Sequence, residues 1–228
     1  MTAFTVLHVC MGNICRSPMA ERLLTRAVHD RAPEASEPLM RSLSAGTGGW
    51  HEGEEMNPPA ARQVLARGGS ADGFTARKLR GDFIDAADLI LAATADQYDY
   101  VVALRPEAAG HTFVMGEFGR LLAAVDRASL PPAGADPDAA SRTFVLGEFG
   151  RLLAGIDAAT LPSAEPKPEA VHARGLAIVK AADRLRDGEP AQAGDDLDDP
   201  WGRGDQTFTR IGDEIEDTTV PFATLLIP

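Results

Sequence analysis

The stretch VCMGNICRSP, residues 9–18, joins a short apolar run to an amphipathic segment. Phe4–Val9 is apolar and rich in β-branched residues, which predicts a buried strand. Ser17 and Pro18 indicate the start of a helix, with Pro18 at its first position, and apolar residues then follow at helical spacing (Met19, Leu23, Leu24 and Val28). A strand, a loop and a helix thus follow one another without a gap, as in a parallel α/β sheet.

The same alternation of strands and helices continues through the first half of the chain. Further strands are predicted at Leu43–Ala45, Asp88–Thr94 and Thr112–Met115, and helices at residues 57–65, capped by Asn57, and 95–104. The four strands predict one domain, residues 1–228, built on a four-stranded parallel sheet flanked by helices. A helix is expected again at residues 168–185, then an acidic loop at 187–204 and a last amphipathic helix that Pro221 should kink or interrupt.

A repeated segment interrupts this regular order. Residues 112–131 recur as residues 143–162, with 15 of 20 positions identical at an offset of 31. We interpret this as an inserted tandem duplication with Pro- and Ala-rich linkers around 131–142 and 162–168. Because two copies are too few for a solenoid, one copy should belong to the core and the other should be an insertion. The sequence leaves open which is which, and the inserted copy is a candidate surface for self-association.

Composition excludes several classes of protein. A formal charge of −12 argues against binding to nucleic acid, and no apolar stretch approaches the roughly 20 residues of a membrane-spanning helix. The first nine residues are too short for a secretory signal, which favours a cytoplasmic protein. With two cysteines and five histidines without ligand spacing, the chain predicts no disulfide framework, no metal and no cofactor.

The candidate chemistry lies between Cys10 and Ser17. A cysteine and an arginine six positions apart, in a loop that opens a helix, can surround a tetrahedral oxyanion with amide groups and the Arg16 guanidinium. The same field favours the thiolate of Cys10, which needs no base to attack phosphorus. Gly12 permits close approach of the backbone, Asn13 tolerates the left-handed conformation, and Ser17 can hydrogen-bond the thiolate while capping the helix.

With these residues, the sequence resembles the low-molecular-weight protein-tyrosine phosphatases. The resemblance rests on VCMGNICRSP followed by MAERLL, and on later blocks in family order: LSAGTGGW (43–50), NPPA (57–60), TARKL (75–79), ADLIL (87–91) and DPWG (199–202). It implies hydrolysis of protein phosphotyrosine through a phosphocysteine on Cys10, with Arg16 holding the phosphate. It also implies a substrate site formed by loop residues and two aromatic walls (Met11, Gly12, Asn13, Ile14, Cys15, Ser17, Trp50 and Trp201).

A general acid is the second requirement, because tyrosine leaves more easily as the phenol than as the phenolate. Two Asp-Pro pairs compete for this role, Asp136-Pro137 and Asp199-Pro200. Only the second is followed by an aromatic residue, Trp201, so the resemblance assigns the acid to Asp199. Asp198 is the substitute if the alignment slips by one position.

Three alternatives remain open beside phosphotyrosine hydrolysis. An arsenate reductase of the same fold can use a similar loop thiolate, although forms that relay electrons through three cysteines need partners that this chain lacks. An inactive phosphoprotein-binding module would not need Cys10, Arg16 and Asp199 together. Relatives that act on phosphoarginine tend to carry Thr at the position of Ile14, whose apolar surface better suits an aromatic ring.

The second cysteine suggests a redox function. A reactive, accessible thiolate is prone to oxidation to the sulfenic acid, and Cys15 at the other end of the loop can resolve it. A reversible Cys10–Cys15 disulfide is therefore expected, as the resemblance also suggests.

Overall fold

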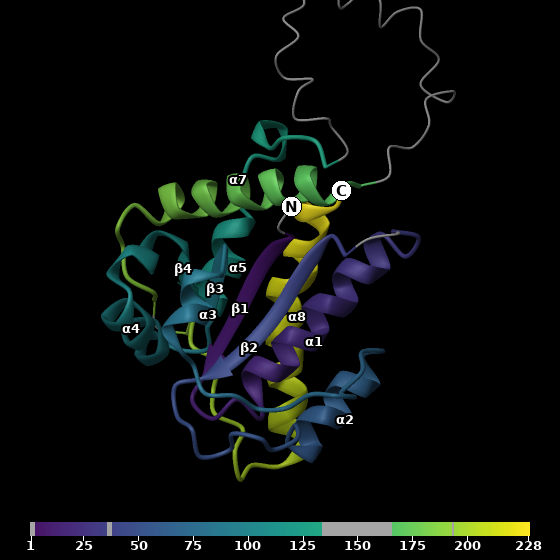
Figure 1. Cartoon of the computed structure of the whole chain (residues 1–228), viewed down its shortest axis with the longest axis vertical. Helices are drawn as coiled ribbons and strands as arrows, with labels where there is room; N and C mark the ends of the chain where they lie inside the picture. Colours follow the sequence, from purple (N-terminus) through teal and green to yellow (C-terminus); the bar gives the residue numbers. More distant parts are fainter. Residues whose placement is uncertain (1–2, 36–37, 134–165, 193) are drawn as a thin grey trace, which may run out of the picture.

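The computed structural model describes residues 3–35, 38–133, 166–192 and 194–228. Four parallel strands form one sheet in the order β2-β1-β3-β4 (Figure 1). They are β1 (Phe4–Cys10), β2 (Met40–Gly46), β3 (Leu89–Ala92) and β4 (Thr112–Val114). The predicted four-stranded parallel sheet is therefore confirmed.

Helices cover both faces of the sheet. One face packs against α1 (Arg16–Arg31), α5 (Met115–Leu122), α7 (Pro168–Arg186) and α8 (Asp205–Leu226), and Figure 1 shows α1 beside α8. The other face packs against α3 (Gly81–Asp85), α4 (Ala95–Leu104) and the 3-10 helix η1 (Pro106–His111). Among the described residues, the remaining helices are α2 (Pro58–Ala66) and the 3-10 helix η2 (Arg127–Ser129). Within the described ranges, no helix combines the length and apolar character needed to cross a membrane.

The sheet has one hydrophobic core on each face, because successive side chains of a strand point to opposite faces. Phe4 and Val6 of β1 point into the larger core, whereas Leu7 and Val9 point into the smaller one. Every residue of β1 is buried, as expected of a central parallel strand covered on both faces. Cys10, at the end of this strand, is therefore held by a fully buried strand.

Several predicted boundaries differ from the structure. The helix at 95–104 is confirmed, but β2 begins three residues earlier than predicted because its exposed first half carries little apolar signal. The prediction that Ser17 caps α1 was wrong: the helix begins at Arg16, Cys15 takes the cap position, and no side chain caps it. Asn57 does precede α2, but its side chain makes no capping hydrogen bond.

Pro221 does not interrupt the last helix. Helix α8 runs from Asp205 to Leu226 with Pro221 inside it. A proline removes one backbone hydrogen bond, yet the flanking residues Thr218, Thr219 and Phe222 are buried against the rest of the chain. Tertiary packing thus offsets the lost bond and carries the helix past the proline.

The first copy of the repeated segment belongs to the core. Its residues form β4 and α5, and Phe113 and Phe118 are fully buried with ring centroids 5.1 Å apart. The second copy, residues 143–162, and most of both linkers lie outside the described residues. The structure therefore places residues 112–122 in the sheet and the adjoining helix, a choice the sequence left open.

Candidate active site

The loop from Cys10 to Arg16 connects the carboxyl end of β1 to the first turn of α1. Neighbouring backbone fixes its course: Thr47 N donates to Cys10 O (2.9 Å), Gly48 N to Met11 O (2.8 Å) and Asn57 N to Ile14 O (2.8 Å). At Gly46, a Cβ atom would lie 2.8 Å from Met11 O and 3.0 Å from Asn13 N. The loop can pass this close to the end of β2 only because residue 46 is glycine.

Asn13 holds the turn of the loop from inside. It has a φ of 55°, the left-handed conformation that the sequence predicted. Its side chain is buried and donates to Ser17 Oγ (2.9 Å) and Ser44 Oγ (2.8 Å), while its Oδ1 accepts from Arg77 N (2.8 Å). One side chain thus joins the loop, α1, β2 and the segment before α3.

A buried carboxyl extends this network. Ser44 Oγ donates to Glu21 Oε2 (2.6 Å), and Arg22 and Arg77 lie 3.5 and 3.7 Å from the same carboxyl group. Burial raises the pKa of Glu21, whereas the bond from Ser44 and the two arginines oppose that rise. Sequence reasoning missed Glu21 and Ser44, because their contact requires β2 to pair with β1.

The two cysteines have different surroundings. Cys10 Sγ lies 3.0 Å from Ser17 Oγ and accepts from Asn13 N at 3.3 Å. For Cys15, burial and then the negative charges of Cys10 and Asp199 raise the thiol pKa to about 12, against the opposing effect of Arg16. Cys15 is therefore a neutral thiol near pH 7.

Arg16 connects the loop to the segment that carries Asp199. Its guanidinium is 5% exposed and donates from Nη2 to Asp199 Oδ2 (2.9 Å) and from Nη1 to Leu197 O (3.1 Å). Trp201 N donates to Asp199 Oδ1 (3.1 Å). The carboxyl group of Asp199 is consequently fixed over the loop although 183 residues separate it from Arg16.

Asp198, the substitute for Asp199, lies outside the pocket. Asp198 is exposed and pairs with Arg210 (2.6 Å), and it is absent from the lining of the pocket that contains Cys10. Asp136 lies outside the described residues. Of the two candidate acids that the structure describes, Asp198 and Asp199, only Asp199 faces the loop.

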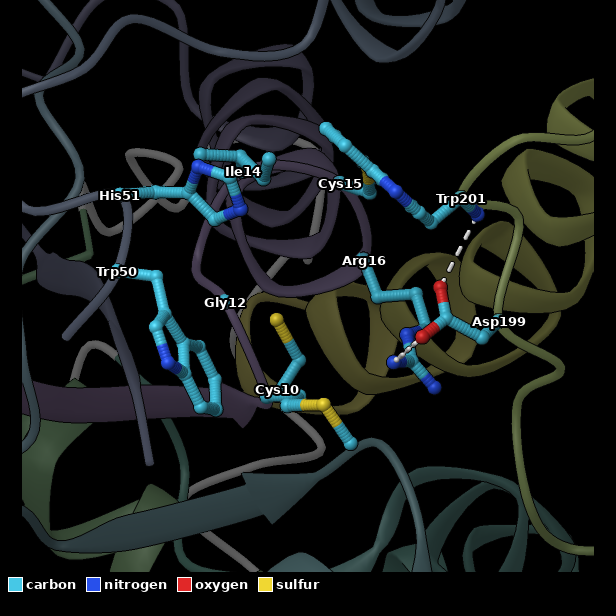
Figure 2. Close-up of a pocket in the computed structure, with 10 residues that line it drawn as sticks. Cys10, Gly12, Ile14, Cys15, Arg16, Trp50, His51, Asp199 and Trp201 are labelled. Carbon is cyan, nitrogen blue, oxygen red and sulfur yellow. Dashed lines mark hydrogen bonds and ion pairs between the residues drawn. The ribbon is translucent and has the colours of Figure 1, made fainter. Parts of the chain in front are cut away.

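A pocket of about 200 Å³ opens above Cys10. Figure 2 shows Trp50 and His51 on one side of it and Trp201 and Asp199 on the other, with Arg16 and Cys15 between. Trp50 is 71% exposed and Trp201 56%, which leaves their rings free to contact a ligand. The lining contains the predicted residues Cys10, Met11, Gly12, Ile14, Cys15, Arg16, Trp50, Asp199 and Trp201. Asn13 and Ser17 lie behind it, hydrogen-bonded to the loop.

His51 is a lining residue that the sequence analysis missed. Its ring lies against Trp201, with centroids 5.3 Å apart, and its Nδ1 is 2.8 Å from Glu54 Oε2. The sequence signal was its position next to Trp50, but a single histidine without ligand spacing gave no reason to select it. Among the described residues, no three His, Cys, Asp or Glu side chains gather as a metal site would require.

This arrangement is typical of α/β proteins that hold a phosphate-like oxyanion over a cysteine. The loop leads into the N-terminus of α1, the guanidinium of Arg16 is buried there, and the carboxyl group of Asp199 faces it. The family model for low molecular weight phosphotyrosine protein phosphatases matches residues 5–130. The chain therefore belongs to that family.

Individual relatives agree with this assignment. The chain is 39% identical over 103 residues to a low molecular weight protein-tyrosine-phosphatase of Streptomyces coelicolor, covering 45% of this chain and 60% of that protein. Among solved structures, the tyrosine phosphatase Wzb of Escherichia coli K30 with sulphate superposes with a TM-score of 0.55 at 18% identity, covering 98% of both chains. The YwlE arginine phosphatase of Geobacillus stearothermophilus gives 0.55 at 21%, covering 97% of this chain and 91% of that one. At these identities the structures support the fold alone.

Proposed function

We propose that this chain is a protein-tyrosine phosphatase that hydrolyses phosphotyrosine through a phosphocysteine on Cys10. The observation that carries the proposal is the Arg16–Asp199 pair, which brings an anion-binding guanidinium and a carboxyl group together above the Cys10 loop. The solved Wzb structure of the same fold contains sulphate, a tetrahedral oxyanion with the shape of phosphate.

In the first step, the Cys10 thiolate attacks phosphorus and the bond to the tyrosine oxygen breaks. The loop amides and Arg16 hold the three remaining phosphate oxygens, and the carboxylic acid of Asp199 donates its proton to the departing phenolate. A phosphate that enters the loop competes with Asp199 for Arg16 Nη2. Binding of the substrate thus frees the carboxyl group to turn toward the leaving oxygen.

In the second step, the Asp199 carboxylate accepts a proton from water as that water attacks the phosphocysteine. The sulfur–phosphorus bond breaks, inorganic phosphate leaves, and Cys10 returns to the thiolate. The hydrogen bond from Ser17 and the amide of Asn13 stabilise the sulfur charge that reappears.

The walls of the pocket favour an aromatic leaving group. Trp50, Trp201 and Ile14 surround the approach to Cys10 and offer apolar surface to a phenyl ring. A phosphoarginine side chain would instead need polar partners for its guanidinium. An electron relay to arsenate through three cysteines is also disfavoured, because the chain contains only Cys10 and Cys15.

The proposal is tested with purified full chain and three substrates: a phosphotyrosine peptide, a phosphoarginine peptide, and arsenate with a small thiol as reductant. We expect hydrolysis of the first only, and loss of all turnover in Cys10→Ser. Asp199→Ala should lower kcat/KM for phenyl phosphate by about 10²–10⁴, whereas Asp136→Ala should leave it unchanged. Equal losses from the two aspartate variants would contradict the role given to Asp199, and preferred turnover of phosphoarginine or arsenate would contradict the substrate.

A further inference from the structure

The segment that ends in Asp199 is anchored by neighbouring elements at several consecutive residues. Asp196 accepts from Ala95 N at the start of α4 (2.8 Å), and Leu197 N donates to Ala93 O beyond β3 (2.8 Å). Leu197 O and Asp199 both bind Arg16. We call residues 195–199 the acid segment.

The first anchor is an ion pair with helix α5. Arg120 donates to both carboxylate oxygens of Asp195, from Nε to Oδ1 (3.4 Å) and from Nη2 to Oδ2 (2.9 Å), and Gln192 N also donates to Oδ2 (2.6 Å). The Asp195 side chain is only 10% exposed, although the Arg120 side chain that pairs with it is 43% exposed. A two-bond geometry of this kind fixes direction as well as distance.

A backbone contact brings the same two elements together. Gly116 N of α5 donates to Asp195 O at 3.2 Å. A Cβ atom on residue 116 would lie 2.6 Å from that oxygen and 2.9 Å from Asp195 Cα, closer than nonbonded atoms normally approach. Helix α5 therefore contacts the acid segment through one side chain and through a position where no side chain fits.

We propose that Arg120 and Asp195 are positioning residues that hold Asp199 in place for proton transfer, an inference that rests on the proposed function. Asp195 is four residues from Asp199, and the chain between them is tied to α4 and β3. Because only three residues lie between them, a shift at Asp195 is passed along the acid segment toward Asp199, and the anchors at Asp196 and Leu197 limit its size. Because Asp196 and Leu197 keep their own anchors, loss of the Arg120–Asp195 pair should misplace Asp199 only in part.

The experiment separates an effect on the acid from an effect on the fold. In the full chain, kcat/KM is measured for phenyl phosphate, which needs the acid, and for 4-nitrophenyl phosphate, whose leaving group departs readily as the anion. Arg120→Met should lower the value for phenyl phosphate about 10-fold, below the roughly 10²-fold that a 1 Å misplacement can cause. The same substitution should change kcat/KM for 4-nitrophenyl phosphate less than about 2-fold, because that leaving group does not need the acid.

Other variants make the comparison specific. Arg120→Lys should recover part of the loss, because it keeps the charge but not the two-bond geometry. Gly116→Ala should reproduce the loss for phenyl phosphate, although alanine favours a helix. Arg105→Met removes a comparable two-bond pair, with Asp85, outside the acid segment and should leave both substrates unchanged. The same substitution in the second copy of the repeat, Arg151→Met, should also have no effect.

The double variant Arg120→Met with Asp199→Ala decides between the two roles. If Arg120 acts through Asp199, its removal should cost almost nothing once the acid is gone. A 10-fold loss that persists in the Asp199→Ala background, or equal losses with both aryl phosphates, would overturn the positioning role alone. A single Asp199→Ala variant without any loss would instead overturn the proposed function, and the positioning role with it.

Discussion

Asn13 combines two properties that substitution can separate, namely its three side-chain hydrogen bonds and its left-handed backbone. Asn13→Gly removes the hydrogen bonds but keeps the freedom to adopt a φ of 55°. It deprives Arg77 N of its acceptor and two serine hydroxyls of a donor. Since each of the two serine bonds contributes about 1 kcal/mol and the orphaned Arg77 amide costs about 1–3 kcal/mol, the free energy of unfolding should fall by about 3–5 kcal/mol.

Asn13→Ala adds a conformational cost to the same loss. An alanine in the left-handed region costs about 1–2 kcal/mol, so this variant should be about 1 kcal/mol less stable than the glycine variant. Both changes are large against a total stability of about 5–15 kcal/mol. Urea denaturation of the three proteins side by side measures the two steps, provided that the slope with denaturant stays constant.

The same variants should weaken the site. Asn13 N also donates to Cys10 Sγ, and the loop depends on this turn to aim its amides at one point. We therefore expect weaker inhibition by inorganic phosphate in both variants, and the larger loss in Asn13→Ala. A glycine variant within about 0.5 kcal/mol of the parent protein would refute the hydrogen-bond argument. An alanine variant as stable as the glycine variant would refute the argument from backbone strain.

Three further predictions concern redox chemistry, pH and the repeat. After mild peroxide treatment, peptide mass mapping should show a Cys10–Cys15 disulfide. The disulfide should form faster as pH rises, because the attacking Cys15 thiol has a pKa of about 12 and becomes the reactive thiolate only at high pH. Sulfonic acid on Cys10 together with a free Cys15 would contradict this prediction. Burial lowers the pKa of His8 to about 3, so between pH 6.5 and 3 the unfolded chain binds a proton on His8 whereas the folded chain does not. Stability should therefore fall by up to about 1.4 kcal/mol per pH unit between pH 6.5 and 3, and His8→Gln should remove that slope in calorimetry relative to the parent. Excision of residues 112–142 leaves one copy of the repeat and should preserve folding and near-normal phosphatase activity; an insoluble product would show that both copies are structural.

Local signals sufficed where neighbouring residues determine the structure. The strand into Cys10, the turn at Asn13 and the helix at 95–104 were all predicted, because apolar spacing and backbone preference act within a few residues. The cap assigned to Ser17 failed for a related reason. Its hydroxyl is used by Cys10 and Asn13, contacts that compete with a cap and that spacing alone does not reveal.

Contacts between distant segments set the limit of what the sequence could predict. Ser44 meets Asn13 only after β2 pairs with β1, and Asp195 meets Arg120 only after α5 packs beside the acid segment. Neither pair has a spacing that a pattern could recognise. Asp199 was identified because its aromatic neighbour made a recognisable motif, whereas the residues proposed to position it form none.

The proposed function requires an acidic chain to bind a phosphate dianion, and the local charge at the loop is what makes this possible. The formal net charge is −12, but salt screens charges that lie more than about 8–10 Å from the loop. Arg16 is buried at the loop. At an effective dielectric constant near 20, its positive charge attracts a unit negative charge about 4 Å away by roughly 4 kcal/mol. The loop amides add to this attraction without any net charge. We therefore propose that affinity for the phosphate is set within one loop, and that discrimination between phosphoproteins falls to the exposed rings of Trp50 and Trp201 and to the residues beside them.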